Sequence, residues 1–320
     1  MGLDTSSIMF LCAARSMGVD FGSTAMVGRQ SFWPDEAALR RVFSVLGIDR
    51  DAADFLRQHE YGEEFFSLLG AHQVDSVDLS PYERATILHD MNLPLPIELR
   101  ERFTLVYDGG TLEHVFNIPQ AFKNCMEMVR IGGHFTQVNV ANNFAGHGFW
   151  QFSPELIFRM FSEQNGFRLE AVLMHEVTPG GAWYLVSDPD DLRQRVQLCN
   201  DQPTYILTIA KRFDRAPIFA RTPQQSDYVS LWDRTLNQTP QVHEAGWRHY
   251  IPPSVKQLLK SLLGRVYQRP RDGCWPTLAP GFSPKAYRVI SEDDLLRGRL
   301  PGREPAPPFT REDDQGAVIR

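Results

Sequence analysis

Several acidic side chains of this sequence stand where strand-like segments end, and carboxylates in such places can bind polar ligands. Asp78, Asp90 and Asp108 each follow a short run of apolar and β-branched residues. Each carboxylate can accept charge-assisted hydrogen bonds from hydroxyl or amino groups, which contribute roughly 1.5–3 kcal/mol apiece. A solvated turn explains any one of these acids equally well. Their succession along the chain favours a binding edge.

The stretch FTLVYDGGTLEHVF, at residues 103–116, ends a strand-like pattern with residues that can do chemistry. Gly109 and Gly110 lack a Cβ, so a ligand could approach the main chain there. His114 can hold or release a proton near neutral pH. Glu113 is expected in the first turn of a helix, where the helix dipole favours an acid. The stretch is therefore either a polar turn or the mouth of a binding site.

A second histidine, His147, lies between two glycines in a loop and could close over a bound substrate. His114 and His147 are the candidates for acid–base catalysis, although a histidine in either position can have only a structural role. The cysteines are scattered with no CxxC spacing. We therefore predict no metal site and no disulfide framework, as is typical of a reducing cytoplasm.

The elements that must position these residues alternate along the chain. Apolar periodicity predicts strands at residues 23–28, 73–78, 86–88, 103–107, 134–140, 169–177 and 203–211, and helices at 34–46, 50–70, 119–129 and 153–164. This alternation implies βαβ units and a largely parallel sheet with helices on both faces. Ligands bind such sheets outside the carboxyl ends of the strands. The residues expected along that rim are Gly28, Asp78, Asp90, Asp108 and Asn142.

Two helix ends carry capping signals. Ser153 is expected to cap the N-terminus of a helix that has Pro154 in its first position. Gly132 and Gly133 are expected to close the helix at 119–129 in the manner of a C-terminal glycine cap.

The bulk composition is that of an ordinary globular protein. The chain has 320 residues, 42% hydrophobic and 22% charged, with a formal net charge of -6 and a pI of about 5.9. A dedicated nucleic-acid binder usually carries a basic excess, so we predict no nucleic-acid partner. The apolar run at 8–14 is too short to span a bilayer and follows an acid, which argues against a transmembrane segment and a signal peptide. We predict a cytoplasmic protein.

The residues from 74 to 167 resemble the core of class I S-adenosylmethionine-dependent methyltransferases, in particular a group of uncharacterised bacterial methyltransferase-like proteins. The segments that carry the resemblance are LVYDGGTLEHV, MVRIGGHF and GHGFWQFSPELIFRMFSEQNGF. The resemblance extends over residues 20–212. It implies a Rossmann-like α/β fold whose sheet is mostly parallel with an antiparallel last strand, and whose helices cover both faces.

The resemblance implies S-adenosyl-L-methionine as the cofactor. Asp78 would hold the ribose, the segment around Asp90 would face the adenine, and Asp108 would begin the floor of the pocket. The residues that it implies for cofactor binding are Gly28, Arg29, Gln30, Asp78, Leu79, His89, Asp90, Met91, Asp108, Gly109 and Gly110. His114 and His147 would be the catalytic residues.

The first loop departs from the pattern of the family, which has a GxGxG-like sequence after the first strand. This chain has AMVGRQSF, with Gly28 kept and with Gln30 and Phe32 in the places of the later glycines. Arg29 could instead pair with the carboxylate of the cofactor's methionine. The chain from Gly28 to Asp78 is also longer than one crossover helix needs, which predicts a helical insertion.

Three functions from different classes fit these patterns. The first is a methyltransferase for a small-molecule or carbohydrate acceptor, in which positioning for in-line transfer supplies up to about 7–11 kcal/mol. The second is a catalytically silent methyltransferase-like module whose altered first loop no longer holds the cofactor. The third is a nicotinamide-dependent oxidoreductase, which ranks last because no GxGxxG follows any strand.

The expected domain organisation has three parts. Residues 1–215 form the methyltransferase-like domain, with the helical insertion at about 33–70. Residues 216–295 form a C-terminal helical or irregular extension, and the Pro- and acid-rich tail at 296–320 is expected to be poorly ordered. A basic amphipathic helix at 254–268 could rest on an anionic membrane surface or on a partner, although an ordinary solvated helix packed on the main domain is the favoured interpretation. The C-terminal extension as a whole could contact a protein partner or support a dimer.

Overall fold

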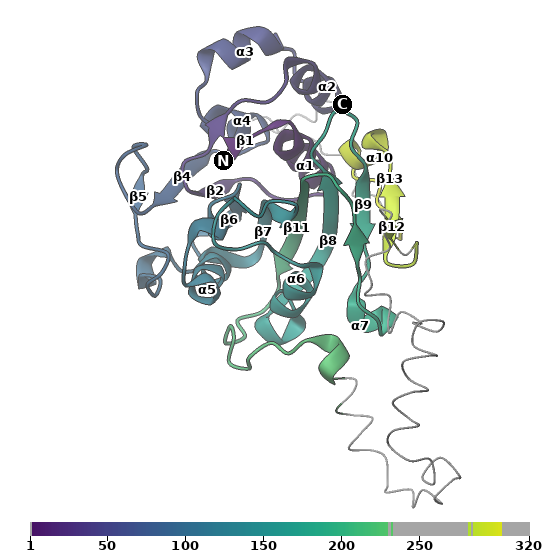
Figure 1. Ribbon diagram of the computed structural model, residues 1–320. Coiled ribbons are helices and arrows are strands. Elements are labelled where there is room, and N and C mark those ends of the chain that lie inside the picture. Colours follow the sequence, from purple (N-terminus) through teal and green to yellow (C-terminus); the bar gives the residue numbers. More distant parts are fainter. Residues whose placement is uncertain (1, 230–231, 233–280, 283, 303–320) are drawn as a thin grey trace, which may run out of the picture.

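A large sheet with helices on both faces forms the centre of the protein (Figure 1). The computed structural model describes residues 2–229, 232, 281–282 and 284–302. Within these residues, nine strands form one sheet in the order β13-β9-β8-β11-β7-β6-β2-β4-β5. Their bounds are β2 Ser23–Val27, β4 Gln73–Asp78, β5 Ile87–Leu88, β6 Phe103–Asp108, β7 Val129–Asn142, β8 Phe167–Glu176, β9 Trp183–Val186, β11 Thr204–Arg212 and β13 Tyr287–Ile290.

The strands β5, β4, β2, β6 and β7 are parallel, whereas β11 runs antiparallel between β7 and β8. This order confirms the predicted α/β fold with a mostly parallel sheet and an antiparallel last strand. Strands β9 and β13 add a further antiparallel edge that the sequence did not indicate.

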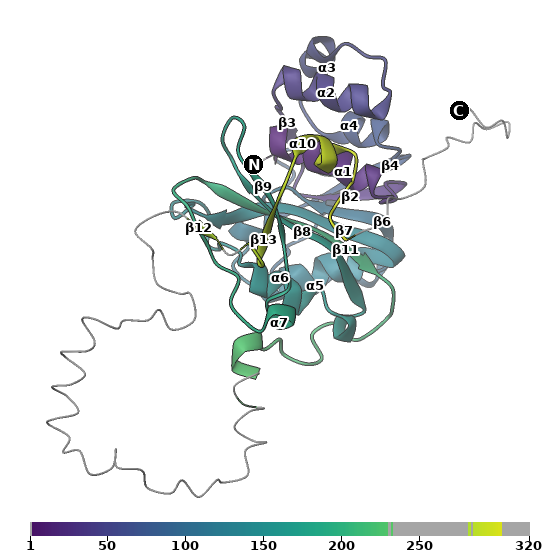
Figure 2. The ribbon, with the colours of Figure 1, turned by 90° about the vertical axis from the view of Figure 1, so that its right-hand side faces the viewer.

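The helices lie on both faces of the sheet, as the alternating pattern predicts (Figure 2). One face is covered by α1 (Thr5–Ser16), α10 (Glu292–Leu296) and the group α2 (Glu36–Leu46), α3 (Ala52–Gln58) and α4 (Glu63–Leu68), and the other by α5 (Ile118–Met128) and α6 (Pro154–Met160). Successive strand side chains point to opposite faces, so Met26 joins one hydrophobic core while Val27 joins the other.

The predicted cap at the start of α6 is confirmed. The side chain of Ser153 accepts a hydrogen bond from the main-chain nitrogen of Leu156, and Pro154 occupies the first turn. The start of α2 uses the same device, because the carboxylate of Asp35 accepts from two main-chain nitrogens of the first turn. These local signals set where the helices begin.

The predicted glycine cap after α5 is wrong. Helix α5 ends at Met128, and Val129 begins β7, which contains both Gly132 and Gly133. A Cβ on Gly133 would lie 2.6 Å from the main-chain oxygen of Thr104 in β6, so glycine permits the close approach of these two strands. Gly133 therefore allows two strands to pack closely, and neither glycine ends a helix.

The loop after β2 does not lead directly into a helix. Gly28 is followed by β3 (Ser31–Phe32), which pairs with β1 (Gly2–Leu3) at the N-terminus of the chain. Helices α2, α3 and α4 then precede β4. The segment between β2 and β4 thus contains three helices and a short strand where a single crossover helix would suffice.

Residues near the C-terminus return to the main sheet. β13 pairs with β9, and the hydroxyl of Ser16 in α1 donates to the carbonyl of Leu296 in α10 over 2.8 Å. The predicted basic helix at 254–268 lies outside the described residues, as do residues 303–320 of the predicted tail, so both stay predictions. Within the part of the chain that the structure describes, no helix is long and apolar enough to span a membrane.

Candidate functional site

The predicted rim residues follow strands that run in the same direction. Val27, which precedes Gly28, is paired with Asp108, and Asp78 is paired with Leu88. Because these strands are parallel, their carboxyl ends meet at one edge of the sheet. We call this edge of β2, β4, β5, β6 and β7 the carboxyl edge.

The last residue of β4 is Asp78, and its carboxylate makes few hydrogen bonds within the protein. Asp78 accepts one long hydrogen bond of 3.3 Å, from the main-chain nitrogen of Ser80. The main-chain nitrogen of His89 donates to the carbonyl of Asp78, which brings the end of β5 beside it. The ring atom Nε2 of His89 is buried and has no hydrogen-bond partner among the described residues. Leu79 is exposed.

The segment after β5 forms a turn that the side chain of Asp90 stabilises. Its carboxylate accepts hydrogen bonds from the main-chain nitrogen of Asn92 over 2.9 Å and from the Asn92 amide over 2.8 Å. These bonds lower the pKa of Asp90. Met91, between them in sequence, is buried in the core beneath. A ligand at this edge would therefore meet a carboxylate already fixed in place.

Gln30 occupies the space between the loop at Gly28 and the end of β6. Its side chain is buried, and Nε2 donates to the carbonyl of Val27 over 2.7 Å. Its Oε1 atom has no hydrogen-bond partner among the described residues, and a Cβ on Gly109 would lie only 2.5 Å from it. The room that Gly109 leaves is thus taken by Gln30, a side chain of the same chain.

Gly28 itself has a backbone conformation that favours glycine. Its φ is +70°, and an added Cβ would lie 2.4 Å from Oγ1 of Thr111. The hydroxyl of Thr111 donates to the carbonyl of Val27 over 2.8 Å. Gly110 also has a positive φ, of +95°. The glycines here allow the loops after β2 and β6 to pack closely on each other.

Arg29 is engaged by the helical insertion and by the segment after β4. Its Nε donates to Oε1 of Glu63 over 2.6 Å, its guanidinium lies 3.8 Å from the ring centre of Tyr61, and Nη1 donates to the carbonyl of Glu83. The guanidinium therefore already has a carboxylate, an aromatic face and a carbonyl as partners.

Asp108 is fully buried and shapes the turn that follows β6. It accepts hydrogen bonds from the amide of Asn139 over 2.7 Å and from the main-chain nitrogens of Thr111 and Leu112 over 3.0 and 3.3 Å. Burial nevertheless raises the pKa of Asp108 to about 6, with these hydrogen bonds opposing the shift. Its contacts are all with the chain, which makes it the anchor of the turn.

Glu113, His114 and His147 converge at the carboxyl edge, and we call them the Glu113 cluster. Oε1 of Glu113 lies 3.4 Å from Nε2 of His147 and 3.9 Å from Nε2 of His114. The two imidazole rings are 5.0 Å apart between centres. The structure thus brings together the two histidines that the sequence singled out separately.

Glu113 is the member of the cluster that the sequence did not single out. It lies in the short 3-10 turn η2 (Leu112–His114), in the first turn as expected, but its side chain is 0% exposed. Neither carboxylate oxygen makes a hydrogen bond to any described residue. Its 3.4 Å approach to His147 permits charge attraction but lacks the geometry of a hydrogen bond.

The loop that carries His147 is what buries Glu113. The main-chain nitrogens of Phe149 and Trp150 both donate to the carbonyl of Glu113, over 2.7 and 3.2 Å. A Cβ on Gly148 would lie 2.7 Å from that same carbonyl, so the loop can approach only because this residue is glycine. The Gly-His-Gly sequence was the one available signal, since glycines permit such close contact.

Burial shifts the pKa values of Glu113 and His114. It raises the pKa of Glu113 to about 8, and the neighbouring charge of Asp108 adds to the shift. Burial also lowers the pKa of His114 below its usual value, with His147 contributing. At neutral pH the cluster therefore favours a proton on Glu113 and a neutral His114 that can accept one.

Comparison with known proteins finds no matching family model and no matching curated protein. A solved structure from Bacillus halodurans, provisionally assigned as a methyltransferase, is 14% identical over 67% of this chain and 100% of its own, with a TM-score of 0.37. An S-adenosylmethionine-dependent methyltransferase from Mesorhizobium loti is 16% identical over 65% of this chain and 98% of its own, with a TM-score of 0.34.

A third solved structure, of geranyl diphosphate methyltransferase in complex with SAM, is 13% identical over 65% of this chain and 85% of its own, with a TM-score of 0.34. The chain is similar in structure to these three proteins. The fold assignment itself rests on this chain's own sheet, whose parallel strands and antiparallel β11 are what the resemblance to class I methyltransferases implies.

Proposed function

We propose that the protein is an S-adenosyl-L-methionine-dependent methyltransferase that acts on a small-molecule or carbohydrate-type acceptor. The observation that carries the proposal is the presence, at the carboxyl edge, of buried polar atoms that have no hydrogen-bond partner among the described residues, next to a nearly free carboxylate. These are Nε2 of His89 and Oε1 of Gln30, while the carboxylate is that of Asp78. Buried polar atoms without partners are rare and call for an explanation, which a bound ligand would supply.

The adenosine half of the cofactor fits the residues present. The carboxylate of Asp78 would accept hydrogen bonds from the ribose hydroxyls, with Leu79 beside it. His89 and Asp90 would face the adenine, which the buried Met91 supports from below. Each of these residues follows the adjacent strands β4 and β5, as a nucleoside at a parallel sheet requires.

The methionine half would have to meet Gln30, which fills the room beside Gly109. The free Oε1 of Gln30 would accept a hydrogen bond from the methionine ammonium. Arg29 would contribute at this end only by exchanging the carboxylate of Glu63 for that of the cofactor. Asp108 and Gly110 would act through the main chain that they shape.

In the proposed reaction, the bound cofactor supplies an electrophilic methyl group. The chain's own residues would hold the acceptor in line and remove its proton, and His114 and His147 are the groups placed to accept that proton. Exposed aromatic side chains beside the cluster would contact the acceptor. Phe116 and Phe149 are 72% and 67% exposed, and their rings lie 5.8 Å apart between centres.

A second candidate is a catalytically silent module that binds a partner. The observation that favours it is the filling of the first loop: the side chains of Gln30 and Thr111 stand where Gly28 and Gly109 lack a Cβ. The loop also continues into β3 and so offers no helix N-terminus to a charged ligand.

Titration of the purified protein with S-adenosylmethionine, S-adenosylhomocysteine and NADH separates these functions. We expect the first two to bind, and Asp78→Ala to weaken binding roughly 10- to 100-fold through loss of charge-assisted hydrogen bonds. Glu98→Ala, at an exposed acid in the 3-10 turn after β5, is the matched control and should bind like the wild type.

The outcomes against the proposal are distinct. No binding of any of the three compounds would favour the silent module. Binding of NADH alone would favour an oxidoreductase. Equal binding by the wild type and Asp78→Ala would remove Asp78 from the site while leaving the cofactor in place.

A further inference from the structure

We propose that Glu113, His114 and His147 bind a divalent transition-metal ion, for which Zn²⁺ is the best match to the ligand types. The proposal departs from the sequence-based expectation of no metal site. It does not depend on methyl transfer, because it concerns binding of the ion by the protein alone.

The spacing of the three side chains suits a metal centre. One ligand atom from each residue lies within 4.8 Å of the others. Zinc bonds of about 2.0–2.2 Å in a tetrahedral site put neighbouring ligand atoms roughly 3.3–3.5 Å apart. The 3.4 Å between Glu113 Oε1 and His147 Nε2 already has this value, and His114 Nε2 lies 3.9 Å from the same oxygen.

The buried carboxylate is a second and independent observation. Glu113 is completely buried, with both oxygens unpartnered among the described residues. Within those residues, the two histidines are the only basic side chains within ion-pair distance of it. A buried carboxylate is normally paired or bound to a metal, because removing it from water without compensation is unfavourable. A bound cation would supply that compensation.

The local fold holds the ligands together before any ion binds. Glu113 and His114 follow β6, whereas His147 comes from the loop after β7. The hydrogen bonds from Phe149 and Trp150 to the carbonyl of Glu113 fasten that loop to the turn. The indole Nε1 of Trp150 adds a further bond, to the carbonyl of Val115. Two distant parts of the chain therefore meet in a fixed arrangement, as a metal site requires.

The ligand types and their exposure indicate which ion and which kind of site. Two imidazoles and a carboxylate suit zinc or iron, whereas Mg²⁺ and Ca²⁺ prefer oxygen ligands throughout. The side chains of His114 and His147 are 48% and 34% exposed. Three protein ligands with an open side leave at least one coordination position for an oxygen of water or of a substrate, as in catalytic zinc sites.

Calorimetric titration of the untagged full chain, after treatment with EDTA and dialysis, tests the proposal. ZnCl₂ is the probe and MgCl₂ the parallel control. We expect one Zn²⁺ per chain and no heat of binding from Mg²⁺. His114→Ala and His147→Ala should each weaken Zn²⁺ binding at least tenfold, and Glu113→Gln should do the same with little change in shape. His72→Ala, at an exposed histidine before β4, is the matched control.

Thermal unfolding of each variant shows whether it is folded. In the wild type, Zn²⁺ should raise the midpoint of unfolding, because it binds the folded state. That rise should vanish in the folded Glu113→Gln variant and persist in His72→Ala. The proposal is overturned if the wild type binds no Zn²⁺, or if His114→Ala and His147→Ala bind it as tightly as the wild type.

Discussion

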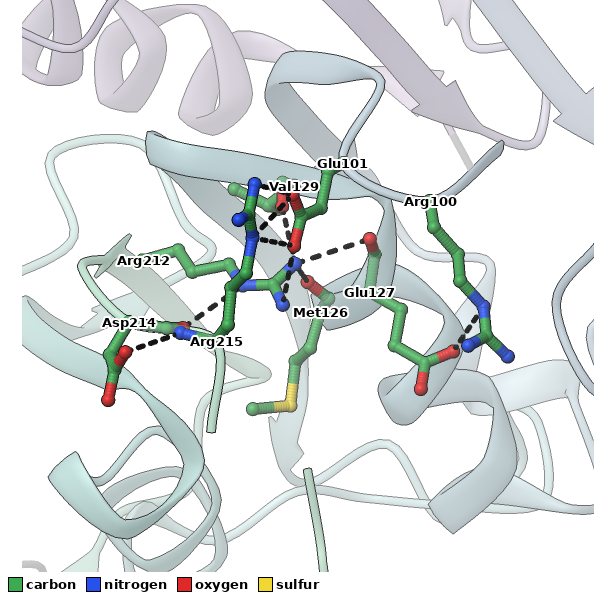
Figure 3. Close-up of polar contacts among 8 residues, drawn as sticks. All are labelled: Arg100, Glu101, Met126, Glu127, Val129, Arg212, Asp214 and Arg215. Carbon is green, nitrogen blue, oxygen red and sulfur yellow. Dashed lines mark hydrogen bonds and ion pairs between the residues drawn. The ribbon is translucent and has the colours of Figure 1, made fainter. Parts of the chain in front are cut away.

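The two edges of the central sheet each bury a titratable side chain, with opposite surroundings. At the amino edge of β6 and β7, Arg212 is 5% exposed and is surrounded by partners (Figure 3). At the carboxyl edge, Glu113 is 0% exposed and has no hydrogen-bond partner among the described residues. A buried polar side chain with partners is part of the scaffold, whereas one without them points to a ligand.

The surroundings of Arg212 consist of main-chain carbonyls and an acid. Nη1 donates to the carbonyls of Met126, Glu127 and Val129 over 3.2, 3.3 and 2.7 Å. Nη2 lies 3.6 Å from the carboxylate of Glu101. The residue thereby joins strand β11 to the junction between α5 and β7, which fixes the register of the sheet at this edge.

The largest effect is expected at the amino edge. Arg212→Met should lower the free energy of unfolding by about 3–5 kcal/mol, because the carbonyls and the acid around it lose their donor in a buried place. Urea unfolding followed by circular dichroism measures it. A loss below about 1 kcal/mol would show that the buried arginine is not the anchor that its contacts indicate.

A pH effect is expected at His175, a titratable side chain near the end of β8. Its ring stacks on Trp183 at 3.8 Å between centres, and burial lowers its pKa to about 4 from a usual value of 6.5. The folded state disfavours the protonated ring, so the stabilisation is present above pH 6.5 and is lost as the pH falls to about 4. The loss should be about 3 kcal/mol.

Urea unfolding at several pH values measures this effect. His175→Phe keeps an aromatic ring against Trp183 but cannot titrate, so its stability should vary less between pH 7 and pH 4 than that of the wild type. Equal pH dependence in the two proteins would contradict the assignment.

The matching substitution at the carboxyl edge, Glu113→Met, should change the free energy of unfolding in the opposite direction. Glu113→Met, measured in EDTA at neutral pH, should raise the free energy of unfolding by about 1–3 kcal/mol. The reason is that a buried polar group with no hydrogen-bond partner among the described residues is replaced by an apolar one of similar length. Substitution by the same residue at Arg212 and Glu113 makes the comparison direct. Destabilisation by Glu113→Met would mean that this carboxylate has structural partners after all.

The smallest effect is expected at Arg215, beside Arg212. Its guanidinium pairs with both oxygens of Glu101 but its side chain is 74% exposed. Arg215→Ala should lower the free energy of unfolding only marginally, as is usual for exposed ion pairs. A loss as large as that of Arg212→Met would show that the network, and not burial, determines stability at this edge.

Much of the fold could be predicted because its signals are local. The alternation of apolar residues located β4 at its observed bounds, and Ser153 with Pro154 located the start of α6. The position of the carboxyl edge could also be predicted, because parallel strands place their carboxyl ends at the same edge of a sheet. The glycine pair after α5 misled the prediction because glycine serves helix ends and close strand contacts equally well.

The candidate site was less predictable, because its character depends on residues far apart in the chain. The pairing of Arg29 with Glu63 and the placement of Gln30 against Gly109 have no local pattern. The burial of Glu113 likewise depends on a loop that begins thirty-odd residues later and folds back over it.

The sequence by itself determined the elements, their order and the edge at which polar residues collect, because backbone preference and apolar periodicity act over a few neighbouring residues. Only the tertiary structure decided which of those polar residues are satisfied by the chain and which are left for a ligand. Asp108 ends strand β6 and Glu113 follows it closely, yet Asp108 has three donors and Glu113 has none among the described residues. The hydrogen-bond partners of a buried side chain are the groups that tertiary packing places beside it. Which groups those are depends on the whole fold.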